Sequence, residues 1–145
     1  MRERSRARGW ALQILYAWEM RGPGRALPDV LADFASERRI AETSRDYLFR
    51  LVLTVHDHLE EIDAALDGCL TNWRLERVSV IDRAILRLGA AELLYLDDVP
   101  PRVSIQEALA LAGKYGTHES PRFVNGVLDA LMHSAASGAA NGGSP

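Results

Sequence analysis

The apolar residues of this chain recur every three to four positions along almost its whole length. That spacing places apolar side chains on one face of an α-helix, whereas a half-buried strand alternates every second residue. No sustained alternation and no β-branched run bounded by turns occurs in the sequence. The pattern therefore predicts an all-α fold of about five to seven helices.

Turn signals divide the N-terminal part of this pattern. We expect a first helix over residues 5–20, stopped by the Arg-Gly-Pro-Gly stretch 21–24, and a short second helix beginning near Pro28. An apolar stripe over residues 48–66 then predicts one long central helix, with a hydroxyl near residue 43 or 44 as its cap.

Hydroxyl residues mark three further helix starts. They are Ser79 with Asp82 three residues on, Ser104 with Glu107 three residues on, and Ser120 followed by Pro121. Gly116 is expected to end the middle one of these helices in a left-handed conformation. Small residues dominate from Ser134 onward, so we expect one domain over residues 1–135 and a disordered tail over 136–145.

Composition excludes several classes of protein. The chain of 145 residues is 48% hydrophobic, which suffices for one cored domain or two small helical subdomains that share a core. Its single cysteine excludes an internal disulfide framework. No apolar run of about 18 residues could span a membrane, and no apolar core follows the N-terminal arginines as in a secretory peptide. We expect a cytoplasmic protein.

The N-terminus is locally basic although the net charge is −3. Arg4 directly precedes the first expected helix, Arg6 and Arg8 fall in its first turns, and Tyr16 and Leu12 are expected on its solvent face. An exposed ring beside guanidinium groups suits single-stranded RNA, because the ring stacks on a base while arginine contacts phosphate. Packing of Tyr16 on a neighbouring helix or on another subunit is equally open.

The segment 115–127 is a second candidate site. Amides at the start of the last helix, beside Ser120 and Arg122, could receive a phosphate, and Phe123 could offer a stacking surface. Glu119 opposes a phosphate unless it accepts hydrogen bonds from base edges. A well-capped helix start with Phe123 sealing the core is the alternative, and the spacing favours it slightly.

Catalytic and metal-binding patterns do not assemble in this sequence. His56 and His58 diverge on a helix, and His118 and His133 lack ligand spacing. Cys69 is expected to be a buried apolar residue rather than a nucleophile. The sequence predicts a binding module without enzymatic activity, cofactor or metal.

Several fragments together resemble one family. They are Ala11-Leu-Gln-Ile-Leu-Tyr-Ala-Trp18, Asp82-Arg-Ala-Ile-Leu-Arg-Leu88, Glu92-Leu-Leu-Tyr95, Asp98-Val-Pro-Pro101, Glu107-Ala108 and Ser120-Pro-Arg-Phe-Val-Asn-Gly-Val-Leu-Asp129. Each fragment alone is weak, but in this order and spacing they resemble the NusB family of transcription antitermination factors. The resemblance implies a compact bundle of about seven helices in two subdomains.

The resemblance also implies a function. It implies binding to single-stranded boxA RNA of ribosomal RNA leaders together with the ribosomal protein NusE, and joining of the elongating RNA polymerase with other Nus factors. The implied RNA-binding residues are Arg4, Arg6, Arg8, Gln13, Tyr16, Glu119, Ser120, Arg122 and Phe123. The implied NusE-binding residues are Glu76, Arg83, Arg87 and Glu92.

Two other interpretations stay open. The chain could be a relative of the NusB-like domain fused to RNA cytosine methyltransferases, although its polar C-terminal end favours a stand-alone factor. It could also be a purely structural module, in which the first helix forms a homodimer through Leu12 and Tyr16. A dimer that dissociates when RNA binds would reconcile the last interpretation with RNA binding.

Overall fold

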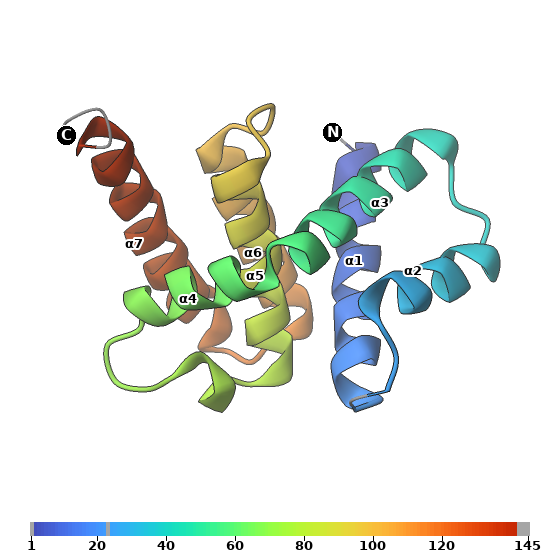
Figure 1. The fold of residues 1–145 in the computed structure, drawn as a ribbon, viewed down its shortest axis with the longest axis horizontal. Coiled ribbons are helices and arrows are strands. Elements are labelled where there is room, and N and C mark those ends of the chain that lie inside the picture. The colour runs from blue at the N-terminus through green and yellow to red at the C-terminus, as the bar shows by residue number, and fades with distance from the viewer. Residues whose placement is uncertain (1, 23, 142–145) are drawn as a thin grey trace.

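The computed structural model describes residues 2–22 and 24–141, and these residues form seven α-helices, one short 3-10 helix and no strand (Figure 1). In chain order the helices are α1 Arg2–Met20, α2 Leu27–Ser36, α3 Glu42–Asp57, α4 Leu59–Cys69, η1 Leu75–Arg77, α5 Val80–Tyr95, α6 Pro101–Tyr115 and α7 Ser120–Asn141. The predicted all-α bundle of about seven helices is confirmed.

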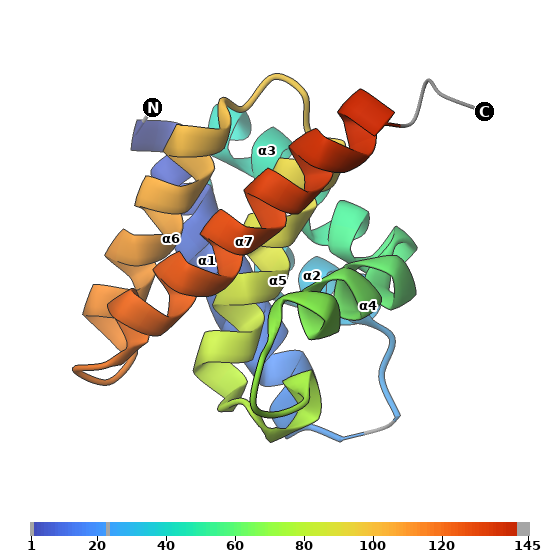
Figure 2. The same cartoon turned by 90° about the vertical axis from the view of Figure 1, so that its left-hand side faces the viewer.

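The helices form two groups that share α5. Helices α1, α2 and α3 pack together, and α4, α6 and α7 pack around α5, which also contacts α1 and α3 (Figures 1 and 2). A single apolar core runs through both groups. Helices α1 and α6 also lie against each other, and this contact positions the candidate site.

Helix α1 begins earlier than predicted, at Arg2, and buries an apolar stripe that includes Ala11, Ile14 and Leu15. The helix ends at the expected turn, where Gly22 has a φ of 76°. Glycine tolerates this left-handed conformation because it has no Cβ. Leu12 is 1% exposed, so the expectation that it faces solvent is wrong.

The predicted long central helix is interrupted at His58, which separates α3 from α4. The backbone there has φ −120° and ψ 25°, and the His58 ring stacks on Tyr95 of α5 with centroids 3.9 Å apart. Helix α3 packs mainly on α1, α2 and α5, whereas α4 packs on α5 and α7. The two halves of one apolar stripe thus pack against different sets of helices. Periodicity alone does not show this division.

One of the three predicted capping signals is confirmed in full. The Ser79 hydroxyl accepts a hydrogen bond from the amide of Asp82 at the start of α5. The Ser104 signal is wrong, because α6 begins at Pro101 and places Ser104 in its interior, where the hydroxyl is buried without a hydrogen-bond partner. The expected hydroxyl cap of α3 is wrong too, since Ala41 precedes the first turn and Ser44 is buried.

The turn between α6 and α7 differs from its prediction in two ways. Gly116 is extended, with φ −91° and ψ −164°, rather than left-handed. Glycine is required at this position because the surrounding chain leaves no room for a side chain. A Cβ there would lie 2.4 Å from the Ser120 hydroxyl oxygen and 2.8 Å from the carbonyl oxygen of Ala112. Ser120 accepts a hydrogen bond from the amide of Thr117, so its hydroxyl closes the preceding loop instead of capping α7.

Helix α7 continues past Ser134 to Asn141 and so includes residues 136–141 of the segment expected to be a tail. Several of the added residues are alanine, the strongest helix former, which allows the helix to extend beyond its last core residue, Leu131. Residues 142–145 lie outside the described part of the chain.

Candidate nucleic-acid interface

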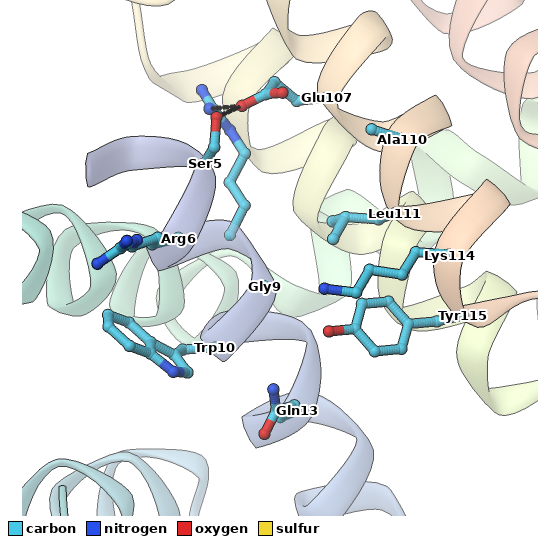
Figure 3. Close-up of a pocket in the computed structure, with 11 residues that line it drawn as sticks. Ser5, Arg6, Gly9, Trp10, Gln13, Glu107, Ala110, Leu111, Lys114 and Tyr115 are labelled. Carbon is cyan, nitrogen blue, oxygen red and sulfur yellow. Dashed lines mark hydrogen bonds and ion pairs between the residues drawn. The ribbon is translucent and has the colours of Figure 1, made fainter. Parts of the chain in front are cut away.

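A groove of about 470 Å³ lies between α1 and α6 (Figure 3). We call it the α1–α6 groove, and its lining residues are Ser5, Arg6, Arg8, Gly9, Trp10, Gln13, Glu107, Ala110, Leu111, Lys114 and Tyr115. Two of the sequence-predicted RNA-binding residues, Arg6 and Gln13, are exposed in this groove. The groove thus joins the N-terminal arginines to a part of α6 that carried no prediction.

Gly9 opens the middle of the groove. In Figure 3, Lys114 and Tyr115 extend from α6 toward α1, while Arg6 and Trp10 lie on the other flank of α1. Between these two pairs Gly9 carries no side chain, and a Cβ added there would meet nothing within 4 Å. A bound chain could therefore cross the α1 backbone at Gly9 and contact both pairs.

The groove combines positive charge with aromatic surface. No carboxylate of the described residues lies within ion-pair distance of Arg6 or Lys114, and the Lys114 ammonium lies 5.2 Å from the centroid of the Tyr115 ring. Tyr115 is 36% exposed and Trp10 is half-buried. Cations beside aromatic rings suit the phosphates and unpaired bases of a single strand.

Arg8 is not available to a ligand, which corrects its prediction as an RNA contact. Its side chain is buried, and the guanidinium donates from Nε to Glu92 and from Nη1 to Glu107, each at 2.7 Å. Burial by itself would lower the pKa of Arg8, but Glu92 in particular reverses this effect and leaves the pKa raised. Arg8 is therefore a permanent buried cation beneath the groove.

The carboxylates around Arg8 connect four helices. Glu92 of α5 also accepts a hydrogen bond from the Tyr47 hydroxyl of α3, and Glu107 of α6 accepts one from the Ser5 hydroxyl of α1. Burial and the neighbouring Glu92 raise the pKa of Tyr47, so its hydroxyl stays protonated as a donor. This network holds α1 against α6 and thus sets the width of the groove.

Arg4 has an internal partner near the surface. It donates to Asp98 at 2.8 Å, and Arg50 donates to both oxygens of the same carboxylate. Its guanidinium also lies 4.5 Å from the centroid of the Tyr47 ring. The hydrogen bonds from Arg50 and Arg4 hold the pKa of Asp98 well below its usual range. Arg4 is half-buried and contributes less free charge than its position in the arginine run implies.

Tyr16 is 40% exposed, as the helical pattern predicts. It lies one turn beyond Gln13 on α1, outside the α1–α6 groove, and lines an adjoining hollow between α1 and α2 that Gln13 and Tyr115 also line. Gln13 and Tyr115 therefore mark the point where the two concave surfaces meet.

The late candidate residues lie around the start of α7, next along the chain from Tyr115. Glu119 and Arg122 are exposed there, whereas Phe123 is half-buried and packs against the core. Ser120 is 1% exposed and bonds within the protein, so its expected role as a direct RNA contact is wrong. The conformation matches the sealed helix start more closely than an open phosphate site.

Of the four residues expected to bind NusE, three line one hollow of about 460 Å³, namely Glu76, Arg83 and Arg87, whereas Glu92 does not line it. Glu76 is exposed on η1, and Arg83 is half-buried on α5. Arg87 and Glu92 are only 8% and 2% exposed, so the free chain offers little of either side chain to a partner. Arg87 instead pairs with Asp63 and Glu19, as the Nε–Oδ1 distance of 2.9 Å and the Nη1–Oε1 distance of 2.6 Å show.

The sequence interpretation missed Lys114, included Tyr115 only as the first residue of the candidate segment 115–127, and treated Trp10 as core. A helical stripe formed by residues 107, 111 and 114 on one face of α6 is visible in the sequence. Nothing in that stripe indicates that it faces the arginines of α1, because the contact joins residues about 100 positions apart, as the pairing of Ser5 with Glu107 shows.

Three properties of the described residues bear on chemistry and location. They contain no group of three or more His, Cys, Asp or Glu side chains placed to hold a metal ion. None of their helices is both long and apolar enough to cross a membrane. Cys69 is half-buried, and burial raises the pKa of its thiol, so it has little thiolate character.

Comparison with known proteins gives consistent results. A model of the NusB family matches residues 5–133. A transcription antitermination protein NusB from Nocardioides sp. is 43% identical over 91% of this chain and 95% of its own length, and one from Chloroherpeton thalassium is 38% identical over 90% of this chain and 61% of its own length. A solved structure of antitermination factors NusB and NusE in complex with dsRNA is 32% identical, with a TM-score of 0.83 over 92% of this chain and 98% of the other.

Proposed function

This chain belongs to the NusB family, and from that premise we propose that it is a transcription antitermination factor that binds boxA-type RNA together with NusE. In this role it joins the elongating RNA polymerase with other Nus factors during ribosomal RNA synthesis. Relatives that act in transcription, and a neighbour solved with NusE and RNA, support the proposal. The role is regulatory, assigns no reaction to the chain, and places it in the cytoplasm.

The observation that carries the proposal is the α1–α6 groove. It presents Arg6 and Lys114 for phosphates and Tyr115 for a base, on either side of an open floor at Gly9. Because the groove places the exposed Tyr115 ring and the half-buried Trp10 ring beside cations, it fits a single strand whose bases are unstacked. A double helix keeps its bases stacked inside, so it would use only the cations.

Among the residues predicted from the sequence, we assign RNA contacts to Arg6, Gln13 and Tyr16, with Arg122 and Glu119 extending the surface. Arg4 is a secondary contact because Asp98 already holds it. We add Lys114 and Tyr115 because they line the groove.

For NusE we propose a surface around η1 that includes only the accessible residues among the four expected from the family resemblance. Trp73 is 57% exposed in the turn before η1, and Glu76 is exposed beside it. An exposed tryptophan next to charged side chains is typical of the anchor residues that dominate protein interfaces. Arg83 supports this surface from below by donating to the carbonyl oxygen of Val78.

The direct test is RNA binding measured by fluorescence anisotropy. A boxA-type single strand, a scrambled strand and a duplex are each titrated with and without NusE, at several salt concentrations. We expect preference for the boxA strand that increases when NusE is present. Equal binding of all three RNAs, or no binding either with or without NusE, would overturn the proposal. A stable dimer seen by sedimentation would then favour the structural module.

The groove itself is tested by Gly9→Glu. The added side chain enters open space, so the fold stays intact, but its charge and bulk block the groove and repel phosphates. We expect boxA affinity to fall at least tenfold while thermal stability is unchanged. Gly68→Glu is the matched control, since Gly68 lies on α4 and a Cβ there also meets nothing within 4 Å. Equal effects of the two variants would place RNA binding elsewhere.

A further inference from the structure

A second concave surface adjoins the α1–α6 groove and shares Gln13, Tyr16 and Tyr115 with the RNA contacts proposed above. This α1–α2 hollow has a volume of about 430 Å³ and is lined by Leu12, Gln13, Tyr16, Ala17, Arg21, Val30, Asp33, Phe34, Glu37, Arg38, Ile81 and Tyr115. Gln13 and Tyr115 line both surfaces. A strand that leaves the groove past these two residues therefore enters the hollow without crossing a ridge of other side chains.

Aromatic rings stand on two walls of the hollow. Tyr16 of α1 is 40% exposed, and Phe34 of α2 is half-buried. The Arg38 guanidinium lies 3.7 Å from the centroid of the Phe34 ring, which holds it at the rim. Such rings and planar guanidinium groups provide the surfaces on which unpaired bases stack.

The rim of the hollow carries free hydrogen-bonding groups of both charges. Among the described residues, no side chain pairs with the exposed Glu37 carboxylate or with the exposed Arg21 guanidinium, whereas Asp33 is held by Arg25 at 2.7 Å. A carboxylate accepts hydrogen bonds from the amino groups of cytosine, adenine or guanine, and a guanidinium binds phosphate. The free groups thus match the two chemical parts of one nucleotide.

We infer that the α1–α2 hollow is a subsite for one unpaired nucleobase at the end of the RNA strand that occupies the α1–α6 groove. The inference rests on the proposed function, because the strand must first occupy the groove. The base lies between Tyr16 and the Arg38 guanidinium that Phe34 supports, its amino edge meets Glu37, and Arg21 contacts its phosphate. Uracil has no amino group, so the subsite prefers the other three bases.

The size and charge of the hollow favour a base over a second copy of this chain. Its volume lies in the range of about 300–1,000 Å³ typical of sites for small ligands. A helix of another subunit would need a longer apolar trough, but here Arg21, Glu37 and Arg38 interrupt the apolar wall. Each of these charges would be costly to bury against an apolar helix.

The experiment compares three fluorescently labelled RNAs on the full chain. The first is the shortest boxA-type strand that binds, the second carries one added nucleotide, and the third carries the same added nucleotide without its base. Both ends of the strand are extended in turn, because the groove does not reveal strand direction. We expect one end at which the added base, and not the abasic sugar phosphate, improves the Kd about five- to 100-fold. A 2-aminopurine at that position should lose fluorescence as it stacks.

Two variants assign the gain to the hollow. Phe34→Leu removes the aromatic ring that supports Arg38 but keeps apolar packing, and should abolish most of the gain while leaving the affinity of the shortest strand unchanged. Glu37→Gln should reduce the preference for cytosine over uracil at the added position. Phe49→Leu is the matched control, because Phe49 on α3 also lies beneath an arginine, at 4.9 Å from Arg45, but lines neither surface.

The outcomes separate the two proposals. If the shortest strand does not bind, the proposed function fails and this inference fails with it. If the shortest strand binds but an added base improves the Kd no more than an abasic residue does, the inference alone is overturned. A dimer in sedimentation that Phe34→Leu dissociates, together with no gain from the added base, would assign the hollow to a second copy of the chain.

Discussion

Arg6 and Arg8 are two residues apart in the same basic stretch, yet the structure gives them opposite roles. Arg6 is exposed in the α1–α6 groove, whereas Arg8 is 3% exposed and bonded to Glu92 and Glu107. Two residues correspond to about 200° around a helix, so the two side chains leave it in nearly opposite directions. A run of arginines on a helix therefore cannot be treated as one surface.

Removing Glu92 should be far more damaging than removing a surface carboxylate. Glu92→Leu leaves Arg8 buried with Glu107 as its remaining carboxylate, and a buried charge that loses its partner costs about 3–5 kcal/mol. We expect a loss of this size in the free energy of unfolding, measured in urea at pH 7. Asp98→Asn is the control, since it removes the exposed ion pairs to Arg4 and Arg50 and should change stability much less.

Comparable losses in the two variants would mean that the buried network around Arg8 contributes no more than surface pairs. The RNA affinity of folded Glu92→Leu is a separate readout. If the network positions α1 against α6, affinity should fall even at temperatures where the variant is fully folded.

At the scale of the helices, the approach of α7 to α5 depends on one glycine. A Cβ on Gly89 would lie 2.7 Å from Cδ1 of Leu128, whose side chain is fully buried and would have to shift. Glycine inside a helix normally costs stability relative to alanine. Its presence here reflects close packing between α5 and α7.

Gly89→Ala should therefore destabilise the protein, although alanine favours helix. Overpacking costs about 1–3 kcal/mol, and the gain in helix propensity offsets up to about 1 kcal/mol of it. Gly126→Ala on α7 is the matched control, because a Cβ there meets nothing within 4 Å, and it should stabilise by about 0.5–1 kcal/mol. Thermal unfolding of both variants checks the prediction, and stabilisation by Gly89→Ala would contradict it.

The two groups of helices are joined across the molecule by a charge network. Glu19 at the end of α1 accepts hydrogen bonds from Arg83 and Arg87 of α5, at 2.8 and 2.6 Å. Arg87 also binds Asp63 of α4 through two hydrogen bonds of 2.9 Å each. Burial would raise the pKa of Glu19, but the two arginines outweigh it and lower the pKa.

This network predicts a pH dependence of overall stability. A carboxyl group whose pKa is lower in the folded protein than its unfolded value of about 4.3 stabilises the fold above that pH and loses this effect as the pH falls through the folded pKa. Glu19→Gln should therefore lower the free energy of unfolding by about 1–2 kcal/mol at pH 7. The difference from the unmodified protein should shrink steadily below about pH 4.

Urea unfolding of both proteins between pH 3 and pH 7 makes this comparison. A difference that is the same at every pH would show that Glu19 acts through packing rather than charge.

The sequence by itself determined the features that depend on neighbours within a few turns. Helical periodicity predicted the all-α class and the exposure of Tyr16, and the spacing of Ser79 and Asp82 predicted the cap at Ser79, because each depends on residues close along the chain. The ordered fragments of the family resemblance also lie in the sequence, and the match to the NusB family over residues 5–133 confirms them. These signals are local, so they can be recognised without knowledge of the tertiary packing.

Only the tertiary structure decided which charged side chains are buried and which form a surface. It paired Arg8 with Glu92, placed Ser104 inside α6 rather than at its start, and divided the central stripe at His58. It also brought Lys114 beside the arginine-bearing helix α1. Each outcome depends on which helices meet, and helix periodicity specifies an apolar face without specifying the partner that covers it.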